Sequence, residues 1–158
     1  PENELAQSLV VRLDSRTKGP LCDEDLMTSA AGVFSCGNAL HVNDLVDYVS
    51  ESGERAGRAA VDYVHKKRTE ISFQVGQGLQ YLVPQRLNID ADDQNTILYF
   101  RSRKVLEKCA LVLKVNGNEV FRKSYSFLRP PEMERIEYDF GSLGLTPQMR
   151  VSFEIEEG

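Results

Sequence analysis

Hydrophobic and polar residues alternate with a period of two along much of the second half of the chain. The alternation is clearest at residues 71–75, where Ile, Ser, Phe, Gln and Val follow one another, and it returns at 135–140. Further short segments rich in β-branched and aromatic residues lie at 81–87, 96–103, 109–115, 119–125 and 150–155. Such segments are typical of half-buried strands. We therefore predict about seven short strands, arranged as an immunoglobulin-like β-sandwich of two sheets.

Three short stretches add detail to this β-rich part. Asn116, Gly117 and Asn118 stand between two strand segments, and this composition favours a hairpin turn. Pro84 interrupts the segment 81–87, which predicts an edge strand or a crossing between sheets. The aspartate-rich stretch 90–95 lacks the ligand spacing of an EF-hand, so we interpret it as a solvated turn.

The first part of the chain follows a different pattern. Short apolar runs at residues 10–13 and 33–36 have the composition of buried strands, and 21–28 fits a returning strand. The run 33–36 is too short for a helix and favours a strand of a parallel sheet. Gly37 follows it, and glycine allows the sharp turn that would end such a strand.

A helical period begins after this turn and continues to about Lys66. Asn43 is the candidate N-cap, and Asp44 and Asp47 would lie near the positive end of the helix. One face carries a stripe of apolar and small residues: Leu45, Val49, Gly53, Ala56, Ala60 and Val64. These small side chains predict close packing against a neighbouring layer. The basic residues 66–68 mark the helix end, so we predict domains at 1–68 and 69–158.

Composition narrows the class of protein. The formal net charge is −5. Residues 1–68 contain eight basic and eleven acidic residues, and residues 69–158 contain eleven and thirteen, so neither domain has the basic surface of a nucleic-acid binder. No apolar run approaches the length of a membrane-spanning helix, and we expect no membrane contact. The three cysteines are widely spaced and form no CxxC pair, which favours a reducing, cytoplasmic location.

The sequence from Gly32 to Asn38, followed by residues 54–60 (Glu-Arg-Ala-Gly-Arg-Ala-Ala), resembles the last FAD-contacting segment of pyridine nucleotide-disulfide oxidoreductase-type flavoproteins. In that family a strand ending in small-x-Gly-Asp precedes a helix with a Gly-x-x-Ala-Ala pattern. The stretch from Cys36 to Asp47 is similar to a bacterial subgroup of FAD-dependent oxidoreductases. The resemblance covers about residues 1–65, and it implies an α+β chain, mainly β, whose first part completes a FAD/NAD(P)-binding-type domain.

The resemblance also implies which residues would contact the cofactor. Gly37 and Asn38 would lie against the ribityl and pyrophosphate part of FAD, and the helix start would face the flavin. Asn38 stands where most of the family has Asp, and an amide can donate as well as accept hydrogen bonds. His41 could contact flavin or substrate, or it could cap a loop. The cofactor-binding candidates are Cys36, Gly37, Asn38, His41, Val42, Asn43 and Asp44.

Other features expected of a complete flavoprotein are absent from the sequence. No GxGxxG fingerprint follows a strand, because Gly76-Gln77-Gly78 lies in a β-rich segment without a following helix. Cys36 is a lone thiol, for which a structural role is favoured over a catalytic one. We therefore predict the C-terminal fragment of a FAD-dependent oxidoreductase whose parent moves hydride between NAD(P)H and a substrate. The missing N-terminal FAD/NAD domains would be its partner, and the fragment alone would bind no FAD and be inactive.

A second hypothesis comes from a different class of protein. The chain could be a non-enzymatic interaction module whose β-sandwich binds a protein partner through an exposed apolar patch. Residues 1–68 distinguish the two hypotheses: in a flavoprotein fragment they form an incomplete layer with an uncovered apolar face, which we expect to be mobile, dimerised or domain-swapped, as a homodimer or a domain swap. A basic group in the β-rich part is either a solvated face or a docking face: Arg101, Arg103, Lys104, Arg122 and Lys123.

Overall fold

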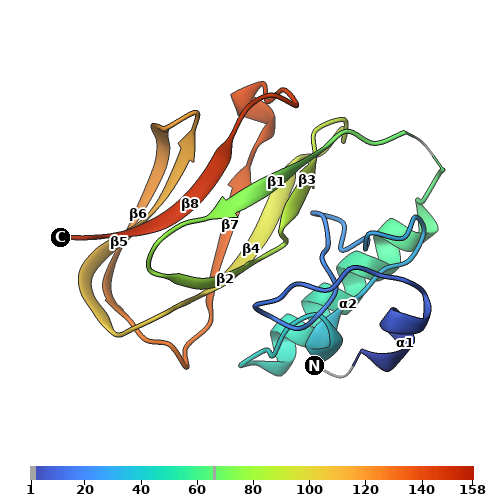
Figure 1. Cartoon of the computed structure of the whole chain (residues 1–158), viewed down its shortest axis with the longest axis horizontal. Coiled ribbons are helices and arrows are strands. Elements are labelled where there is room, and N and C mark those ends of the chain that lie inside the picture. Colours follow the sequence, from blue (N-terminus) through green and yellow to red (C-terminus); the bar gives the residue numbers. More distant parts are fainter. Residues whose placement is uncertain (1–2, 66) are drawn as a thin grey trace.

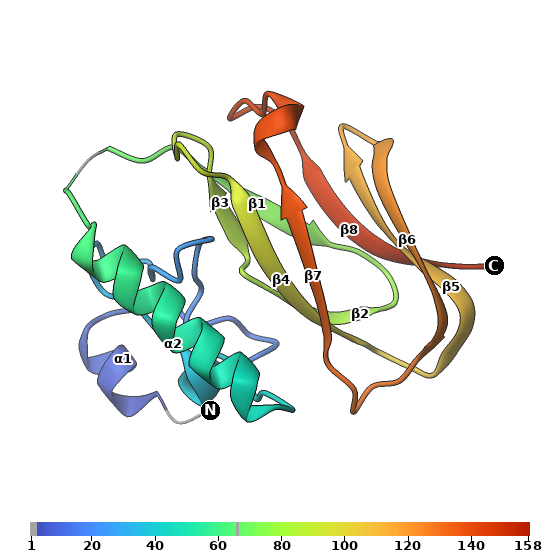
Figure 2. The same cartoon turned by 180° about the vertical axis from the view of Figure 1, so that it is seen from behind.

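The computed structural model describes residues 3–65 and 67–158. The chain is mainly β, with two sheets on one side and a layer of helices and loops on the other (Figures 1 and 2). The predicted loop at Pro1 and Glu2, and Lys66 near the predicted helix end, lie outside the described residues.

The larger sheet contains five strands and the smaller sheet three. The order in the larger sheet is β3 (Arg86–Asn88), β1 (Glu70–Val75), β8 (Val151–Glu157), β5 (Leu106–Val115) and β6 (Asn118–Leu128). The order in the smaller sheet is β2 (Leu79–Val83), β4 (Asn95–Ser102) and β7 (Glu134–Asp139). A short 3-10 helix, η2 (Gly141–Leu143), follows β7. The prediction of a mainly β second part is confirmed.

Strand pairing is antiparallel except at one position. β1 runs parallel to β8, with Phe73 opposite Val151, and joins the first strand of this part to the last. The predicted hairpin joins β5 and β6, and Asn116 and Gly117 take positive φ values of 51° and 83° at its turn. Pro84 lies between β2 and β3, which belong to different sheets, so the predicted crossing is confirmed.

The two sheets share one hydrophobic core. Its members come from both sheets, and aromatic rings lie at its centre: Phe73 stacks on Phe140 at 5.3 Å and meets Phe153 edge-on at the same distance. Leu98 and Phe100 of β4 are fully buried there. Inward-facing side chains that interdigitate in this way explain the period of two in the sequence.

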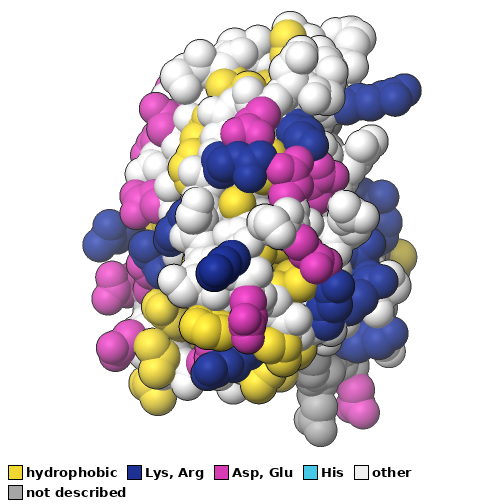
Figure 3. Space-filling view, turned by 90° about the vertical axis from the view of Figure 1, so that its left-hand side faces the viewer, with side chains coloured by type: hydrophobic (Ala, Val, Ile, Leu, Met, Phe, Trp, Pro, Cys, Tyr) yellow, Lys and Arg dark blue, Asp and Glu magenta, His cyan; other side chains and the backbone are white. Residues whose placement is uncertain are grey.

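The outer face of the larger sheet is ionic. Lys114 pairs with Glu154 and Glu156, and Arg122 pairs with Glu119 and Glu156. Figure 3 shows basic and acidic side chains lying next to one another on this side of the molecule. Exposed pairs of this kind contribute little to stability, and they keep the sheet face hydrated.

The first part of the chain forms no sheet among its described residues, and the predicted strands at 10–13, 21–28 and 33–36 are wrong. Only isolated antiparallel bridges occur there: Leu13 with Pro20, Cys22 with Thr28, and Met27 with Phe34. Positive φ values occur at the first residue of the first run, Val10 (59°), within the second run at Leu26 (63°), and just before the third run at Gly32 (76°). A residue in this conformation turns the backbone out of an extended ladder, so a parallel sheet does not form.

The helices of this part are α1 (Glu4–Ser8), η1 (Gly37–Ala39) and α2 (Val46–Val61). The predicted start of α2 at Asn43 is wrong, because the Asn43 side chain donates to the carbonyl of His41 (2.9 Å) instead of capping the helix. Leu45 is the N-cap and its side chain offers no hydrogen bond. The helix also ends earlier than predicted, at Val61.

The buried face of α2 differs from the predicted stripe. Only Ser52 and Ala56 are buried, and Ala60 and Val64 are exposed. A Cβ added at Gly53 or Gly57 would meet nothing within 4 Å. These glycines therefore serve no close packing, and the prediction for them is wrong. Ser52 faces inward, where its hydroxyl accepts a hydrogen bond from the backbone N–H of Gly37 in the turn before the helix.

A second hydrophobic cluster lies between this layer and the smaller sheet. Cys22, Leu26, Leu40 and Ala56 meet Tyr81 and Val83 of β2, with Phe34 and Cys36 packed beside them. The smaller sheet is therefore covered on both faces, by the larger sheet and by the layer of helices and loops. This explains why Tyr81, Leu82 and Val83 of β2 are all buried.

Candidate functional site

The segment that carries the resemblance forms a turn, a loop and then α2. Cys36 has extended backbone (φ −144°, ψ 172°), and Gly37 follows with a φ of +61°. Glycine adopts this left-handed conformation without strain. A Cβ on Gly37 would lie 3.2 Å from Cγ1 of Val49, so the position also has little room for a side chain.

Ser52 ties this turn to the helix. Its hydroxyl accepts a hydrogen bond from the N–H of Gly37 at 2.9 Å and donates one to the carbonyl of Val49 at 2.8 Å. Ser52 and Gly37 are both buried, so this bond satisfies an N–H that water does not reach. The turn is thus held against the first half of α2.

Asn38 and Asn43 face each other at the exposed end of the loop. The Asn38 Oδ1 accepts hydrogen bonds from the Asn43 backbone N–H (3.1 Å) and from its side-chain amide (3.3 Å). Asn38 is exposed, and its own amide group has no partner among the described residues. The Asn38 side chain therefore closes the loop with one end and offers hydrogen-bond donors to solvent with the other.

His41 is directed inward. It is 2% exposed, and its ring lies 5.4 Å from that of Tyr99 and 5.8 Å from that of Tyr81. Burial, with the charge of Arg101 nearby, lowers the pKa of His41 to about 4, so the ring is neutral near pH 7. Its Nδ1 is buried and has no hydrogen-bond partner among the described residues.

Arg101 of β4 holds the loop after His41. Its guanidinium donates to the Tyr81 hydroxyl (2.8 Å) and the Val42 carbonyl (3.1 Å), and it pairs with the Asp44 carboxylate. Asp44 also accepts the backbone N–H of Met133 at 2.6 Å. Only 11% of the Arg101 side chain is exposed. Of the five basic residues in the predicted group, Arg101 docks this chain's own first part and the other four are exposed.

Glu51 of α2 makes a second link to the smaller sheet. It forms a two-point pair with Arg135 of β7, with distances of 2.7 and 3.0 Å, and accepts a hydrogen bond from the Tyr99 hydroxyl. The bond from Arg135 holds the pKa of Glu51 below its usual value, and burial with the bond to Glu51 raises the pKa of Tyr99. The pair fixes α2 across β4 and β7.

A third link involves two buried carboxyls. Asp23 pairs with Arg68 at 2.6 Å, and Glu24 accepts the backbone N–H of Asn88 at 2.8 Å. Burial raises the pKa of Asp23 to about 6 and that of Glu24 to about 8, with the negative charge of Asp23 adding to the shift at Glu24. Sequence patterns gave no signal for this link, because acidic residues in a loop usually face solvent.

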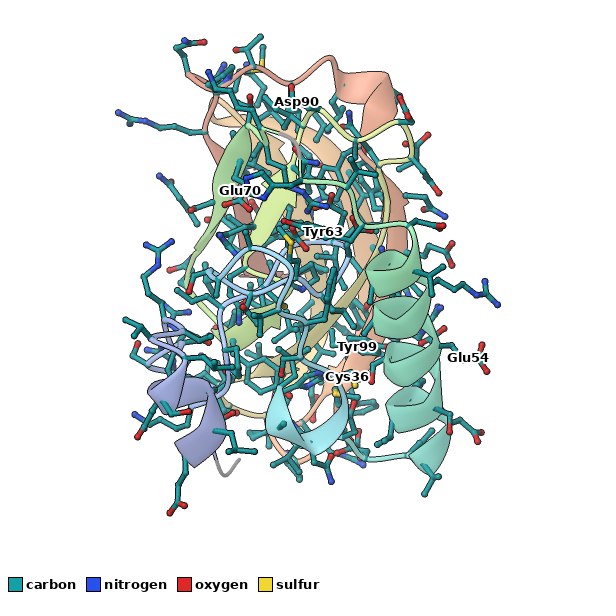
Figure 4. All side chains as sticks on the ribbon, turned by 90° about the vertical axis from the view of Figure 1, so that its right-hand side faces the viewer. Cys36, Glu54, Tyr63, Glu70, Asp90 and Tyr99 are labelled. Atoms are coloured by element: carbon teal, nitrogen blue, oxygen red, sulfur yellow. The ribbon has the colours of Figure 1, made fainter. Side chains whose placement is uncertain are left out.

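The structure brings only some of the predicted site residues together. Asn38 and Asn43 contact each other, whereas His41, Val42 and Asp44 are engaged by the smaller sheet. Cys36 is a half-buried free thiol beside the second cluster, and Figure 4 shows it on the inner side of α2 near Tyr99, while Glu54 projects outward. The candidates that are exposed are Asn38, Val42 and Asp44, although Asp44 is paired with Arg101.

These contacts test how the segment suits FAD. The first N–H groups of α2 have no side-chain cap, and the exposed amide of Asn38 lies beside them. Together they form a set of hydrogen-bond donors that suits the polar ribityl and phosphate groups of FAD. The carboxylate of Asp44 and the ring of His41 are already used within the chain. Asn38 is therefore the side chain that fits a cofactor contact best, and Gly37 shapes the turn that presents it.

A charged cleft of about 490 Å³ lies between α2 and the neighbouring strands. Its acidic lining includes Glu51, Glu54 and Glu137, and its basic lining includes Arg55 and Arg58. Arg55 donates to the Asn95 carbonyl at 3.1 Å, and Arg58 pairs with Glu54 at 3.7 Å. Over its whole lining, acidic side chains outnumber the arginines.

Comparisons with protein-family models, with curated proteins and with solved structures found no match to this chain. No helix within the described ranges is long and apolar enough to cross a membrane. Over the same ranges, no group of three or more His, Cys, Asp or Glu residues is arranged to hold a metal ion.

Proposed function

We propose that this chain is the C-terminal part of a FAD-dependent oxidoreductase and that Asn38 contributes to the wall of its flavin site. The parent protein would transfer hydride between NAD(P)H and a substrate in the cytoplasm. The proposal rests on the Cys36–Asp47 sequence and on one observation. This sequence folds as a glycine turn that leaves the Asn38 amide exposed beside the uncapped start of α2.

The roles of the chain's own residues follow from their contacts. Gly37 and Ser52 fix the turn, Asn38 would donate to polar groups of the cofactor, and Arg101 would anchor the following loop through Asp44. FAD would supply the redox chemistry when bound, and the protein would position it. Residues 69–158, which we interpret as an immunoglobulin-like β-sandwich, would support this wall from behind.

The contribution of Asn38 is tested in the full-length gene product that contains this chain. We expect Asn38→Ala to lower the amount of FAD retained after purification, because the hydrogen bonds of the side chain to the cofactor are lost. Asn38→Asp, the residue that is common in the family, should retain FAD, because a carboxylate can accept hydrogen bonds from the ribityl hydroxyls. Asn118→Ala is the matched control, since Asn118 is exposed in the β5–β6 hairpin. Equal FAD content in all four proteins would contradict the role of Asn38.

The alternative is a non-enzymatic interaction module, and the observation that favours it is an exposed apolar surface, which lies on the first part of the chain and not on the β-sandwich. Leu5 and Val10 are 83% and 87% exposed, and Leu9 is 55% exposed. Beside them lies a mainly apolar groove of about 390 Å³, which Leu5, Leu9, Val11 and Phe34 help to line. Exposed apolar side chains around a groove are typical of a protein-binding surface.

This alternative predicts self-association or partner binding without flavin. We expect the isolated chain to sediment as a homodimer if the groove is an interface between two copies, and Leu9→Asp to convert it to a monomer. Val120→Asp, at an exposed apolar position on β6, is the control. A full-length protein that contains FAD, together with a monomeric chain, would reject the alternative.

A further inference from the structure

A small cleft lies between the loop at residues 12–21 and the ends of three strands. Its volume is about 270 Å³, below the usual range for drug-sized ligands, which begins near about 300 Å³. The loop at residues 12–21 is closed by the bridge between Leu13 and Pro20, and the strands are β1, β2 and β3. The cleft is therefore built from both predicted domains and has room for a compact ligand.

The polar lining of this cleft is mostly basic. It contains three arginines, Arg12, Arg16 and Arg86, and one acidic residue, Asp14. Arg12 and Arg16 are exposed and belong to no ion pair among the described residues, and Arg16 makes only a long contact of 3.4 Å with the Val75 carbonyl. Two positive charges on one rim thus lack a partner within the described chain.

Arg86 forms the inner end of this basic lining. Its side chain is 8% exposed, and its guanidinium pairs with Glu70 at 2.5 Å and donates to the Met27 carbonyl at 3.3 Å. The Nε of Arg86 is buried and has no partner in the described residues. A buried donor without an acceptor is unfavourable, so Arg86 leaves one hydrogen-bonding group unsatisfied at the inner end of the cleft.

Asp14 offsets one of the three positive charges of the cleft, and its carboxylate is held by hydrogen bonds within the loop and from Gln85. It accepts the backbone N–H groups of Arg16 (3.3 Å) and Thr17 (3.2 Å) and the side-chain amide of Gln85 (3.4 Å). These bonds hold the loop in a turn and fix the Arg16 backbone over the cleft. Ser72, which also lines the cleft, has a hydroxyl that no described residue engages.

We propose that this cleft binds a compact tetrahedral oxyanion, namely a phosphate group. Arginine guanidiniums recognise phosphate through paired, charge-assisted hydrogen bonds, and a hydroxyl beside them completes such a donor set. The phosphate group belongs either to free inorganic phosphate or to a small organic monoester. Asn38 does not line this cleft, and the proposal does not depend on the chain being part of a flavoprotein.

The test is titration calorimetry of this chain with inorganic phosphate and with phenyl phosphate, at ionic strength held constant with chloride. We expect saturable binding, weakened at least tenfold by Arg12→Ala and by Arg16→Ala. Both arginines are exposed, so both variants should fold, which circular dichroism will confirm. Arg103→Ala, an exposed arginine after β4, is the matched control and should bind like the wild type.

The two probes distinguish the source of the phosphate. Tighter binding of phenyl phosphate would assign the site to an organic monoester, and tighter binding of inorganic phosphate would assign it to the free anion. Acetate should bind more weakly than either, because it carries one charge and fewer acceptor oxygens. The proposal is overturned if neither phosphate probe binds saturably, or if the Arg12→Ala and Arg16→Ala variants bind as tightly as Arg103→Ala.

Discussion

The glycines of this chain differ in backbone conformation and in the space around them, although the sequence pattern does not distinguish them. Gly37 has a left-handed backbone and stands against Val49, whereas Gly53 and Gly57 lie on an open side of α2. The sequence pattern marked Gly37 correctly as a turn but assigned close packing to the helix glycines. A glycine in a helical stripe looks the same whether its face is buried or open, because the rotation of the helix is set by tertiary contacts such as the Ser52 bond.

The two kinds of glycine predict opposite effects of alanine. Gly37→Ala should lower the free energy of unfolding by about 1–2 kcal/mol, because alanine is strained at a φ of +61°. Gly53→Ala should raise it by about 0.5–1 kcal/mol, since alanine favours the helix and meets no neighbour. Urea unfolding of both variants measures these changes. Destabilisation by Gly53→Ala would show that α2 packs on another face.

The buried carboxyl of Glu24 predicts a pH dependence of stability. Its pKa is about 8 in the folded protein, whereas the reference value for the unfolded chain is 4.5. At pH values between these two, the folded state therefore binds more protons than the unfolded state. The free energy of unfolding therefore falls as the pH rises toward 8, by up to about 1.4 kcal/mol per pH unit for one proton. His41, whose folded pKa is about 4, acts in the opposite direction, but only below about pH 6.5.

Urea unfolding between about pH 6.5 and about pH 8 isolates the Glu24 effect from that of His41. We expect stability to fall across this range in the wild type and to fall less steeply in Glu24→Gln, which cannot ionise. Glu107→Gln, at an exposed position on β5, serves as the control and should keep the wild-type slope. A Glu24→Gln slope equal to that of the wild type would refute the assignment.

At the scale of elements, the strands follow from local pattern and the first layer does not. Each predicted strand between 71 and 155 is found, except that 81–87 is divided at Pro84 into β2 and β3. The strands follow from pattern because a period of two requires only that one face be buried. The predicted strands at 10–13 and 33–36 do not form, because short apolar runs also occur in loops that pack on a sheet. What organises those loops is contact with distant residues such as Gln85, whose side chain accepts the N–H of Cys22 at 3.0 Å.

Arg101 is the element-scale contact whose loss should matter most. Arg101→Ala removes the partner of Asp44, the Val42 carbonyl and the Tyr81 hydroxyl together. Breaking a mostly buried pair by deleting one partner costs about 3–5 kcal/mol, which we take as the upper limit here because Asp44 is partly exposed. Hydrogen exchange should show faster exchange in residues 37–48 in this variant, and Arg103→Ala should leave that segment unchanged.

At the scale of the molecule, the predicted parts 1–68 and 69–158 meet through the smaller sheet. The links at Arg101, Glu51 and Glu24 and the second hydrophobic cluster all join the two parts. The candidate site is therefore placed by the β-rich part as much as by its own sequence. The sequence predicted the turn at Gly37, but it could not show that His41 is buried and that Asp44 pairs with Arg101, because both depend on partners more than 35 residues away.

The visible absorption spectrum of the full-length gene product, recorded beside that of this chain, tests the central claim most directly. If the chain supplies one wall of a flavin site, the purified full-length protein will be yellow with flavin bands and the chain alone will be colourless. If both proteins are colourless, and added FAD restores no flavin bands to the full-length protein, the flavoprotein proposal is contradicted. The glycine turn would then be part of the layer that covers the smaller sheet and nothing more.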